Sequence, residues 1–298
     1  MLLTVVKIVL VLLSVLLLVI GLGTHFLAPY TIIKPFRQPP AQTPADFKLK
    51  FQDWTIGEGE DVPIAAYYIY AGSVPPLAHI LLLHGIGSNK EAWLDLAQIL
   101  SEQGYALVLL DHRAQGQSGG KYATFGFYEK QDVSRVIDRL EASFPKLPIG
   151  VWGHSFGGAV ALKSMVQDRR IRFGIVQSTF ARLDQIVADY FAQSTAGLWP
   201  RWLAKYALRR AGKIASFRPA EVQPIQAARQ IQQPVFVAHG AEDHNIKYEY
   251  GQAIYEALAT EQKELAIVPG AGHENLGMIG GQELLDRQLK FIADCIGN

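Results

Sequence analysis

The sequence opens on an uninterrupted apolar segment. Residues 8–27 contain no Lys, Arg, Asp or Glu, and most of them are Leu, Val or Ile. As a helix they would extend about 30 Å, which matches the hydrocarbon thickness of a bilayer. Because apolar residues occupy every face of this helix, the pattern predicts a membrane span that ends at Pro29.

A cleaved signal peptide is the main alternative for this segment. Cleavage needs small residues before the cut, but the bulky Phe26 lies two residues before a cut after Ala28, and Pro29 follows it. No cysteine closely follows the apolar run to carry a lipoprotein anchor. We therefore expect an uncleaved, single-pass anchor over residues 1–30.

The charges that flank the anchor are nearly balanced. Lys7 lies on one side, and Lys34 and Arg37 lie on the other, so the positive-inside rule gives little direction. N-terminal anchors commonly hold their domain outside the cytoplasm, and we expect that side here. Residues 31–45 contain four prolines, which favours an extended, semi-rigid linker over packed structure. We place the start of the soluble domain at residue 46.

The rest of the chain alternates short apolar runs with longer helical patterns. Alternation at 47–51 predicts a half-exposed strand, and a second strand at 64–70 returns antiparallel after a turn at 57–61. Six continuous apolar runs follow: Ile80–Leu83, Ala106–Leu110, Ile149–Trp152, Phe173–Val176, Val235–Ala238 and Leu265–Val268. Most are separated by helical patterns near residues 90–103, 127–143, 156–167, 247–259 and 281–295. This order predicts an α/β fold with a mostly parallel central sheet, an antiparallel N-terminal hairpin and helices on both faces.

One connection is too long for a plain crossover. It separates Gln177 from Val235, and its large apolar residues are Tyr190, Phe191, Leu198, Trp199, Trp202, Leu203, Tyr206 and Leu208. We interpret residues 181–233 as a helical cap inserted over the sheet. The alternatives are a helix pair on the flank of the sheet, and a segment whose aromatic face also touches the membrane.

The sequence Gly153-His154-Ser155-Phe156-Gly157-Gly158 lies between a predicted strand and a predicted helix. G-x-S-x-G in this context is typical of a nucleophile elbow. The glycines let chain segments approach closely around a strained turn, and the turn presents the serine hydroxyl above the sheet. The alternative is a tight turn whose serine only caps the helix. The context favours Ser155 as a nucleophile.

A serine nucleophile needs a base and an acid that orients the base. Of the eight histidines, His273 is the only one after His244, and it lies in a glycine-rich loop after the last predicted strand. The acid should lie between Ser155 and His273 at the end of a strand, where Asp243 fits best. The alternatives are the adjacent Glu242 and the more distant Asp184 and Asp189.

An oxyanion hole needs two backbone N–H groups. One is expected from Phe156, the residue after the nucleophile. The other is expected from the loop at residues 84–87, where Ile86 is the best candidate. Because only the backbone of Ile86 would act, exchange for another apolar residue should be mild.

Taken in order, the motifs resemble the α/β-hydrolase superfamily from about residue 47 to the C-terminus. They are His84-Gly85, Asp111–Ser118, Gly153–Gly157, His239–Asp243 and Gly272-His273. Within the superfamily the chain looks like membrane-anchored hydrolases and the serine-aminopeptidase or monoglyceride-lipase-like group. It departs from the usual pattern at Ala114, where glycine is common, and we expect this to alter loop packing only. The resemblance implies serine hydrolase activity without specifying a substrate.

Composition narrows the function classes further. Hydrophobic residues make up 49% of the 298 residues, which excludes a largely disordered chain. The formal net charge of +1 argues against a phosphate-driven nucleic-acid binder. The single cysteine, Cys295, leaves no internal disulfide and no cysteine-based zinc site, and packing is its expected role. No metal-ligand cluster is evident, and the expected chemistry needs no metal or cofactor.

These observations predict a serine hydrolase that cleaves a carboxylic ester or a related acyl bond of a small-molecule or lipid-like substrate. Ser155, His273 and Asp243 would form the catalytic triad, and the N–H groups of Ile86 and Phe156 would bind the oxyanion. The alternatives on the same residues are an aminopeptidase or amidase and an acyltransferase. The non-enzymatic alternative is a membrane-tethered binding protein.

Overall fold

A computed structural model describes residues 1–73, 75–144, 147–198 and 200–297. Its central eight-stranded sheet has the order β1-β2-β4-β3-β5-β6-β7-β8. The strands are β1 (Phe51–Ile56), β2 (Ile64–Ile69), β3 (His79–Leu83), β4 (Ala106–Leu110), β5 (Ile149–His154), β6 (Ile171–Gln177), β7 (Val235–Gly240) and β8 (Lys263–Val268). Strand β2 pairs antiparallel with both β1 and β4, and all other pairs are parallel. The expected mostly parallel sheet with an antiparallel hairpin is confirmed.

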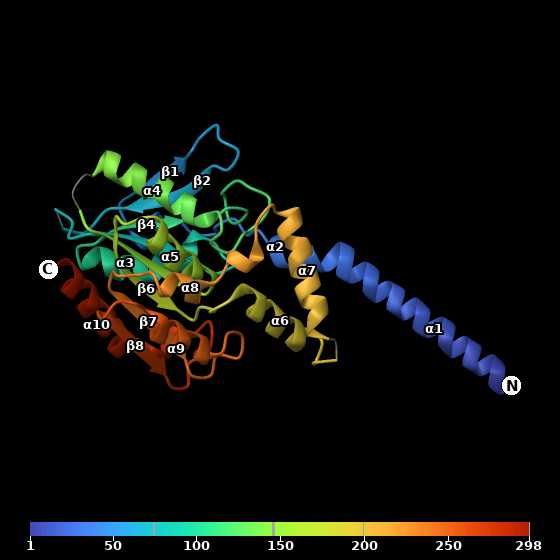
Figure 1. The fold of residues 1–298 in the computed structure, drawn as a ribbon. Helices are drawn as coiled ribbons and strands as arrows, with labels where there is room; N and C mark the ends of the chain where they lie inside the picture. The colour runs from blue at the N-terminus through green and yellow to red at the C-terminus, as the bar shows by residue number, and fades with distance from the viewer. Residues whose placement is uncertain (74, 145–146, 199, 298) are drawn as a thin grey trace.

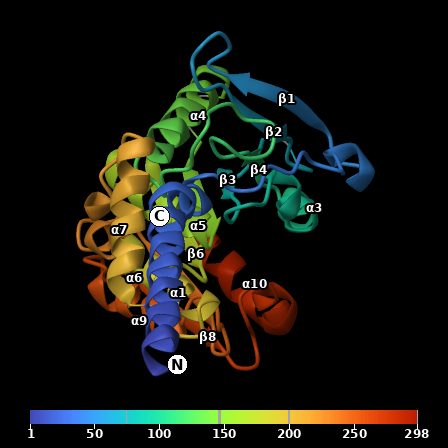
Figure 2. The same ribbon diagram turned by 90° about the vertical axis from the view of Figure 1, so that its right-hand side faces the viewer.

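Helices cover both faces of this sheet (Figures 1 and 2). They are α1 (Leu2–Leu22), α2 (Ala28–Ile33), α3 (Leu94–Glu102), α4 (Glu129–Ser143), α5 (Phe156–Gln167), α6 (Leu183–Ser194), α7 (Arg201–Ile214), α8 (Pro224–Ala228), α9 (Tyr248–Ala257) and α10 (Leu276–Ile296). Alternate residues of a strand point to opposite faces. Leu81 and Leu83 of β3 therefore join the core beneath α4, α5 and α9, whereas Ile80 and Leu82 join the core beneath α3 and α10.

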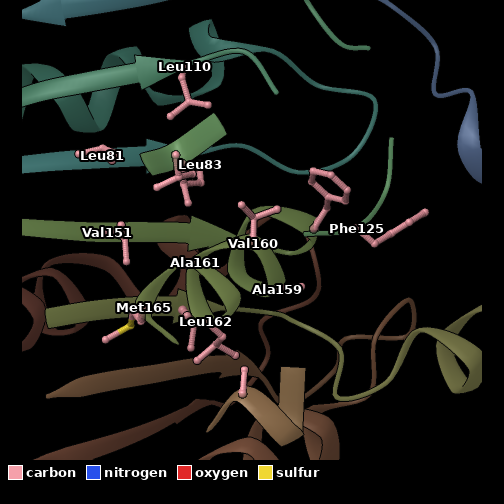
Figure 3. Close-up of a cluster of buried hydrophobic side chains, with 14 of the residues drawn as sticks. Leu81, Leu83, Leu110, Phe125, Val151, Ala159, Val160, Ala161, Leu162 and Met165 are labelled. Atoms are coloured by element: carbon pink, nitrogen blue, oxygen red, sulfur yellow. The ribbon is translucent and has the colours of Figure 1, made fainter. Parts of the chain in front are cut away.

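The core beneath α5 is continuous with the end of the sheet that carries the elbow. Figure 3 shows Val160 of α5 near Leu83 of β3, and Leu162 of α5 on the side of Met165. Phe125, from the loop before α4, lies in the same cluster near the carboxyl ends of the strands. Close packing here fixes the position of the β5–α5 turn.

The N-terminal helix projects away from the domain (Figure 1). Residues Leu2–Ile33 are long and apolar enough to cross a membrane, with a mean hydropathy of 3.1 in the most apolar window, and none of that window is buried. The expected end at Pro29 is wrong. A π-helical turn at Gly23–Leu27 leads into α2, and Pro29 occupies the first turn of α2, directly after this change in the hydrogen-bond pattern.

The segment expected as an extended, semi-rigid linker packs against the domain. Ile33 is fully buried, and its carbonyl accepts a hydrogen bond from the Ala123 amide at 2.9 Å. The Arg37 guanidinium donates to the Gly120 carbonyl at 3.0 Å, and Pro44 is buried. Residues 34–40 form neither helix nor strand, but their contacts hold them to the surface rather than leaving them as a spacer.

The first strand lies later in the chain than the alternation at 47–51 indicated. Residues Pro44–Phe47 form a 3-10 turn, which Lys48 ends in the left-handed conformation at φ 57°. Phe47 and Leu49 still pack against the core on the α3 side, which explains their apolar character. The strand β1 itself buries Trp54.

Helices α6 and α7 occupy the long connection between β6 and β7. They pack against each other, and α7 also packs against α2. Both lie beyond the carboxyl ends of the strands (Figure 1), which is the position of a cap, whereas α8 packs beside α5 and α9. Leu203 and Leu208 face the domain, Leu198 and Trp202 are exposed, and Trp199 lies outside the described residues.

Candidate active site

Ser155 lies at the sharp turn between β5 and α5. Its backbone has φ 54° and ψ −116°, a region that non-glycine residues rarely adopt. The turn is held on both sides. The Ser155 amide donates to the Gln177 carbonyl at 2.8 Å, and the Thr179 hydroxyl donates to the Ser155 carbonyl at 2.7 Å. These contacts maintain a strained conformation that the strand and helix alone would not select.

The glycines of the motif are required by close packing. A Cβ atom on Gly157 would lie 1.9 Å from the Leu83 carbonyl oxygen, and one on Gly153 would lie 2.3 Å from the Gly157 carbonyl oxygen. Both contacts involve backbone atoms, which cannot move aside as a side chain can. The elbow therefore needs glycine at both positions.

The structure brings Ser155, His273 and Asp243 into one hydrogen-bonded chain. His273 Nε2 lies 3.0 Å from Ser155 Oγ, and His273 Nδ1 lies 2.7 Å from Asp243 Oδ2. All three side chains are buried. Because a carboxylate only accepts hydrogen bonds, His273 carries its proton on Nδ1 and presents the lone pair of Nε2 to the serine hydroxyl. This arrangement can take a proton from Ser155.

The Asp243 carboxylate is held by four groups. Oδ1 accepts from the amides of Asn245 and Ile246 at 2.9 and 2.7 Å, and Oδ2 lies 2.7 Å from His273 Nδ1 and 3.3 Å from His239 Nε2. Burial alone would raise the pKa of Asp243, but the hydrogen bonds from His239, His273 and Ile246 outweigh it and hold the pKa well below its usual value. The carboxylate stays charged.

The other three carboxylates considered from the sequence lie elsewhere. Glu242 is exposed. Asp184 pairs with Arg182 at 3.1 Å. Asp189 pairs with Arg201 at 2.7 Å and also accepts a hydrogen bond from the Tyr250 hydroxyl.

Two further histidines contact the site, and sequence reasoning missed both roles. His154 Nε2 donates to the backbone carbonyl of His273 at 3.0 Å. Burial, and then the proximity of His273, lower the pKa of His154, so it donates as a neutral ring. His239 donates from Nε2 to the Ile246 carbonyl at 2.7 Å and faces Asp243. The only signal in the sequence was the position of each histidine beside a predicted site residue.

The loop that carries Ile86 is fixed by buried polar contacts. His84 donates from Nδ1 to the Gly85 carbonyl at 2.7 Å, while its Nε2 accepts from the His112 amide at 3.1 Å. The Gly87 amide donates to the Gln115 side chain at 2.6 Å. Burial lowers the pKa of His84, in agreement with a neutral ring. Ile86 thus lies in a loop that is anchored on both sides.

A buried ion pair supports the same region. Lys90 is 1% exposed and Asp111 is fully buried. The Lys90 amide and Nζ bind the two Asp111 oxygens at 2.7 and 2.8 Å, and Nζ also donates to Gln117 at 2.6 Å. Asp111 therefore holds the loops beside the site in place.

Two cavities meet at Ser155. One has a volume of about 390 Å³, is mostly apolar and is lined by Ile86 and Phe156 together with residues of α2, α6 and α7. The other has a volume of about 760 Å³, lies between α3 and α10, and is lined by His273 and Glu274 among others. In the part of the chain that the structure describes, no three His, Cys, Asp or Glu side chains converge to hold a metal ion.

Known proteins are similar to this chain in sequence and in fold. The uncharacterized protein YqkD of Bacillus subtilis is 29% identical over 65% of this chain, and the match spans 63% of that relative's length. Human monoglyceride lipase is 26% identical over 43% of this chain and 42% of the lipase. The solved structure of the Pyrococcus furiosus esterase Pf2001 superimposes with a TM-score of 0.72 at 26% identity, covering 88% of this chain and 98% of the esterase.

The family assignment rests on the region that contains the elbow. The model of the family described as serine aminopeptidase, S33, matches residues 74–223, half of the chain. That region carries the loop at Ile86, the elbow at Ser155 and both helices α6 and α7. The resemblance seen in the motifs is thereby confirmed. This chain is an α/β-hydrolase that belongs to the serine aminopeptidase S33 family.

Proposed function

We propose that this hydrolase cleaves carboxylic esters through an acyl-enzyme on Ser155, with His273 as the base and Asp243 as the residue that orients it. The observation that carries the proposal is the continuous hydrogen-bonded chain from Ser155 Oγ through His273 to Asp243. The relatives named as esterase and lipase are consistent with this chemistry.

In the proposed mechanism, Ser155 Oγ attacks the ester carbonyl while its proton moves to His273 Nε2. The N–H groups of Ile86 and Phe156 stabilise the oxyanion of the tetrahedral intermediate. The intermediate collapses as His273 gives its proton to the leaving alcohol. Water then loses a proton to His273 and attacks the acyl-enzyme, which releases the acid and restores Ser155. Asp243 stays ionised and stabilises the charged imidazole throughout.

The larger cavity offers one argument for amide substrates with a free amine. Glu274 is exposed in that cavity, and its Oε1 lies 3.9 Å from His273 Nε2, so its charge faces the side where a leaving group would depart. Comparing aminoacyl p-nitroanilides with p-nitrophenyl esters distinguishes an aminopeptidase from an esterase. An acyltransferase would be recognised by an added alcohol that competes with water for the acyl group.

We also propose that residues 1–30 anchor the protein in a membrane, that residues 46–298 form the hydrolase domain with a cap at 181–233, and that this domain lies outside the cytoplasm. The length and hydropathy of Leu2–Ile33 support the anchor. Protease digestion of intact cells and of lysed cells tests the side. Digestion only after lysis would place the domain in the cytoplasm.

Labelling with a fluorophosphonate probe tests the catalytic proposal. The full-length protein in detergent should be labelled and should hydrolyse p-nitrophenyl butyrate, whereas Ser155→Ala should do neither. A folded wild-type protein that is neither labelled nor active would favour the binding-protein alternative. Activity retained by Ser155→Ala would assign the nucleophile to another residue.

A further inference from the structure

The apolar cavity beside Ser155 is closed on one side by the end of the membrane helix. Ala28, Thr31 and Ile32 of α2 line it together with residues of the cap helices α6 and α7. Helix α2 continues from α1 through the π-helical turn, so this wall and the apolar span belong to one helical segment, Leu2–Ile33. The N-terminal helix therefore contributes surface to the candidate active site.

This wall is held firmly against the domain. Ile33 and Pro29 are buried, and α2 packs along α7. One turn earlier, His25 Nδ1 and the Tyr206 hydroxyl share a hydrogen bond of 2.6 Å. The cavity consequently lies at the point where the apolar helix leaves the domain, as the adjoining positions of α1, α2 and α7 show (Figure 1).

The domain surface around that point has the composition of a membrane interface. Phe26 and Leu27 are exposed on the helix, and Trp202 is 64% exposed on α7. The exposed face of α7 also carries Lys205 and Arg209. Aromatic and basic side chains of this kind gather at the headgroup level of bilayers. An apolar chain leaving the bilayer beside α1 would meet the cavity without crossing water.

The two cavities meet at Ser155, so each would hold one side of a substrate whose ester bond lies at the serine. His273 lines only the larger, more polar cavity, so a leaving alcohol that takes its proton from His273 would depart on that side. The acyl part then lies in the apolar cavity, beside the N–H groups proposed for the oxyanion. The apolar cavity has a volume of about 390 Å³. If each methylene group takes about 30 Å³, which is close to the volume of a water molecule in the liquid, the cavity accommodates about a dozen methylene groups.

We propose that the end of the membrane helix, through Ala28, Thr31 and Ile32, is a specificity-determining wall of an acyl-binding site, and that this site takes a medium- to long-chain acyl group of a polar alcohol from the bilayer. This inference rests on the proposed esterase function. It assigns to the N-terminal helix a role in substrate selection in addition to anchoring.

The first test changes the volume of the cavity from the helix side. Full-length wild type, Ala28→Phe and Ile32→Ala are compared in detergent on p-nitrophenyl butyrate, octanoate, laurate and palmitate. The matched control is Leu27→Phe, an enlargement of the adjacent exposed residue that does not line the cavity. Thermal unfolding reports whether each variant is folded, and butyrate hydrolysis gives each variant the reference rate for its chain-length profile.

Ala28→Phe should lower kcat/KM for laurate about tenfold relative to butyrate. The larger side chain would keep about two methylene groups of the laurate chain out of the apolar cavity, and the lost burial of two methylene groups corresponds to about a tenfold factor. Ile32→Ala should move the preference toward palmitate, and Leu27→Phe should leave the profile unchanged. Parallel profiles for all four proteins would overturn the inference while leaving the esterase proposal intact. Should Ala28→Phe fail to fold, the profile of Ile32→Ala decides. No hydrolysis of any ester by wild type would instead refute the proposed function.

The second test identifies the source of the acyl group. The protein is reconstituted in phosphatidylcholine vesicles, and a fluorogenic palmitoyl ester is placed either in the same vesicles or in separate ones. Uptake from the bilayer predicts a faster initial rate when protein and ester share a membrane. Equal initial rates would show that the ester arrives through water and would refute the bilayer source.

Discussion

Replacing Asp243 with Asn tests the proposed triad through the tautomer of His273. Oδ1 of Asp243 accepts from two backbone amides, and Oδ2 faces His273 Nδ1. In Asp243→Asn the amide oxygen should keep the Oδ1 position, because its NH2 group there would face two other donors. The NH2 group would then point at His273 Nδ1, and two donors would oppose each other.

His273 can relieve that conflict by moving its proton to Nε2. The Nε2–H would then point at Ser155 Oγ, 3.0 Å away, and could not accept the serine proton. Replacing the triad aspartate with asparagine in serine proteases of this mechanism lowers kcat about 10⁴-fold, and we expect a similar loss here. That factor corresponds to about 5.5 kcal/mol of transition-state stabilisation. KM should stay near the wild-type value because no binding surface changes.

Melting temperatures distinguish the tautomer change of His273 from a loss of structure. Asp243→Asn keeps both loop hydrogen bonds, so its melting temperature should lie above that of Asp243→Ala. Asp243→Ala loses both bonds to the Asn245 and Ile246 amides, at about 1 kcal/mol each, and should melt several degrees lower while being equally inactive. Glu242→Gln, which changes the exposed neighbouring carboxylate, is the matched control and should be fully active.

The assay is hydrolysis of p-nitrophenyl butyrate by full-length protein in detergent, with the rate of fluorophosphonate labelling as a second readout. Both should fall together in Asp243→Asn. If Asp243→Asn kept more than about a tenth of the wild-type kcat, the tautomer reasoning would be refuted. If Glu242→Gln lost as much activity as Asp243→Asn, the wrong carboxylate would have been assigned.

Three further predictions concern buried or strained positions. Lys90→Met leaves the Asp111 carboxylate buried without its partner and should cost about 3–5 kcal/mol of unfolding free energy; adding Asp111→Asn should restore much of it in thermal melts, and no restoration would contradict the ion-pair account. Ala114 adopts φ 63°, so Ala114→Gly should stabilise the protein by about 1 kcal/mol, and a lower melting temperature would show that the alanine methyl packs better than expected. Burial lowers the pKa of His79 to about 4 in the folded state, whereas the pKa in the unfolded state is about 6.5. Between about pH 6.5 and pH 4 the unfolded state therefore binds a proton that the folded state does not. The free energy of unfolding consequently falls as the pH falls through this range. His79→Phe should remove up to about 3 kcal/mol of that acid destabilisation, and parallel melting curves from pH 7 to pH 4 for the two proteins would refute it.

Local patterns in the sequence were enough for most of the fold. Continuous apolar runs identified β3 to β7 because strands buried on both faces need apolar residues at nearly every position. The edge strand β8 is only half-buried, but its Leu265–Val268 run still identified it. The alternation at 47–51 gave a wrong strand position because Phe47 and Leu49 pack partly buried against the core without pairing in the sheet. The prediction that the helix ends at Pro29 was wrong for a related reason. The rule that proline ends a helix applies to a regular α-helix. Here a π-helical turn precedes Pro29, and the chain continues as α2 after it.

Some features of the candidate site could likewise be predicted from the sequence, and others could not. The sequence by itself determined the elbow around Ser155, the base candidate His273 and the apolar span, because each depends on residue types at short, regular spacing. Only the tertiary structure decided that Asp243 rather than the adjacent Glu242 contacts His273, because neighbouring loop side chains point in different directions. It alone placed His154 against the His273 backbone and the end of the N-terminal apolar helix in the wall of the apolar cavity. These contacts join residues that lie between 30 and more than a hundred positions apart, and no local pattern encodes them.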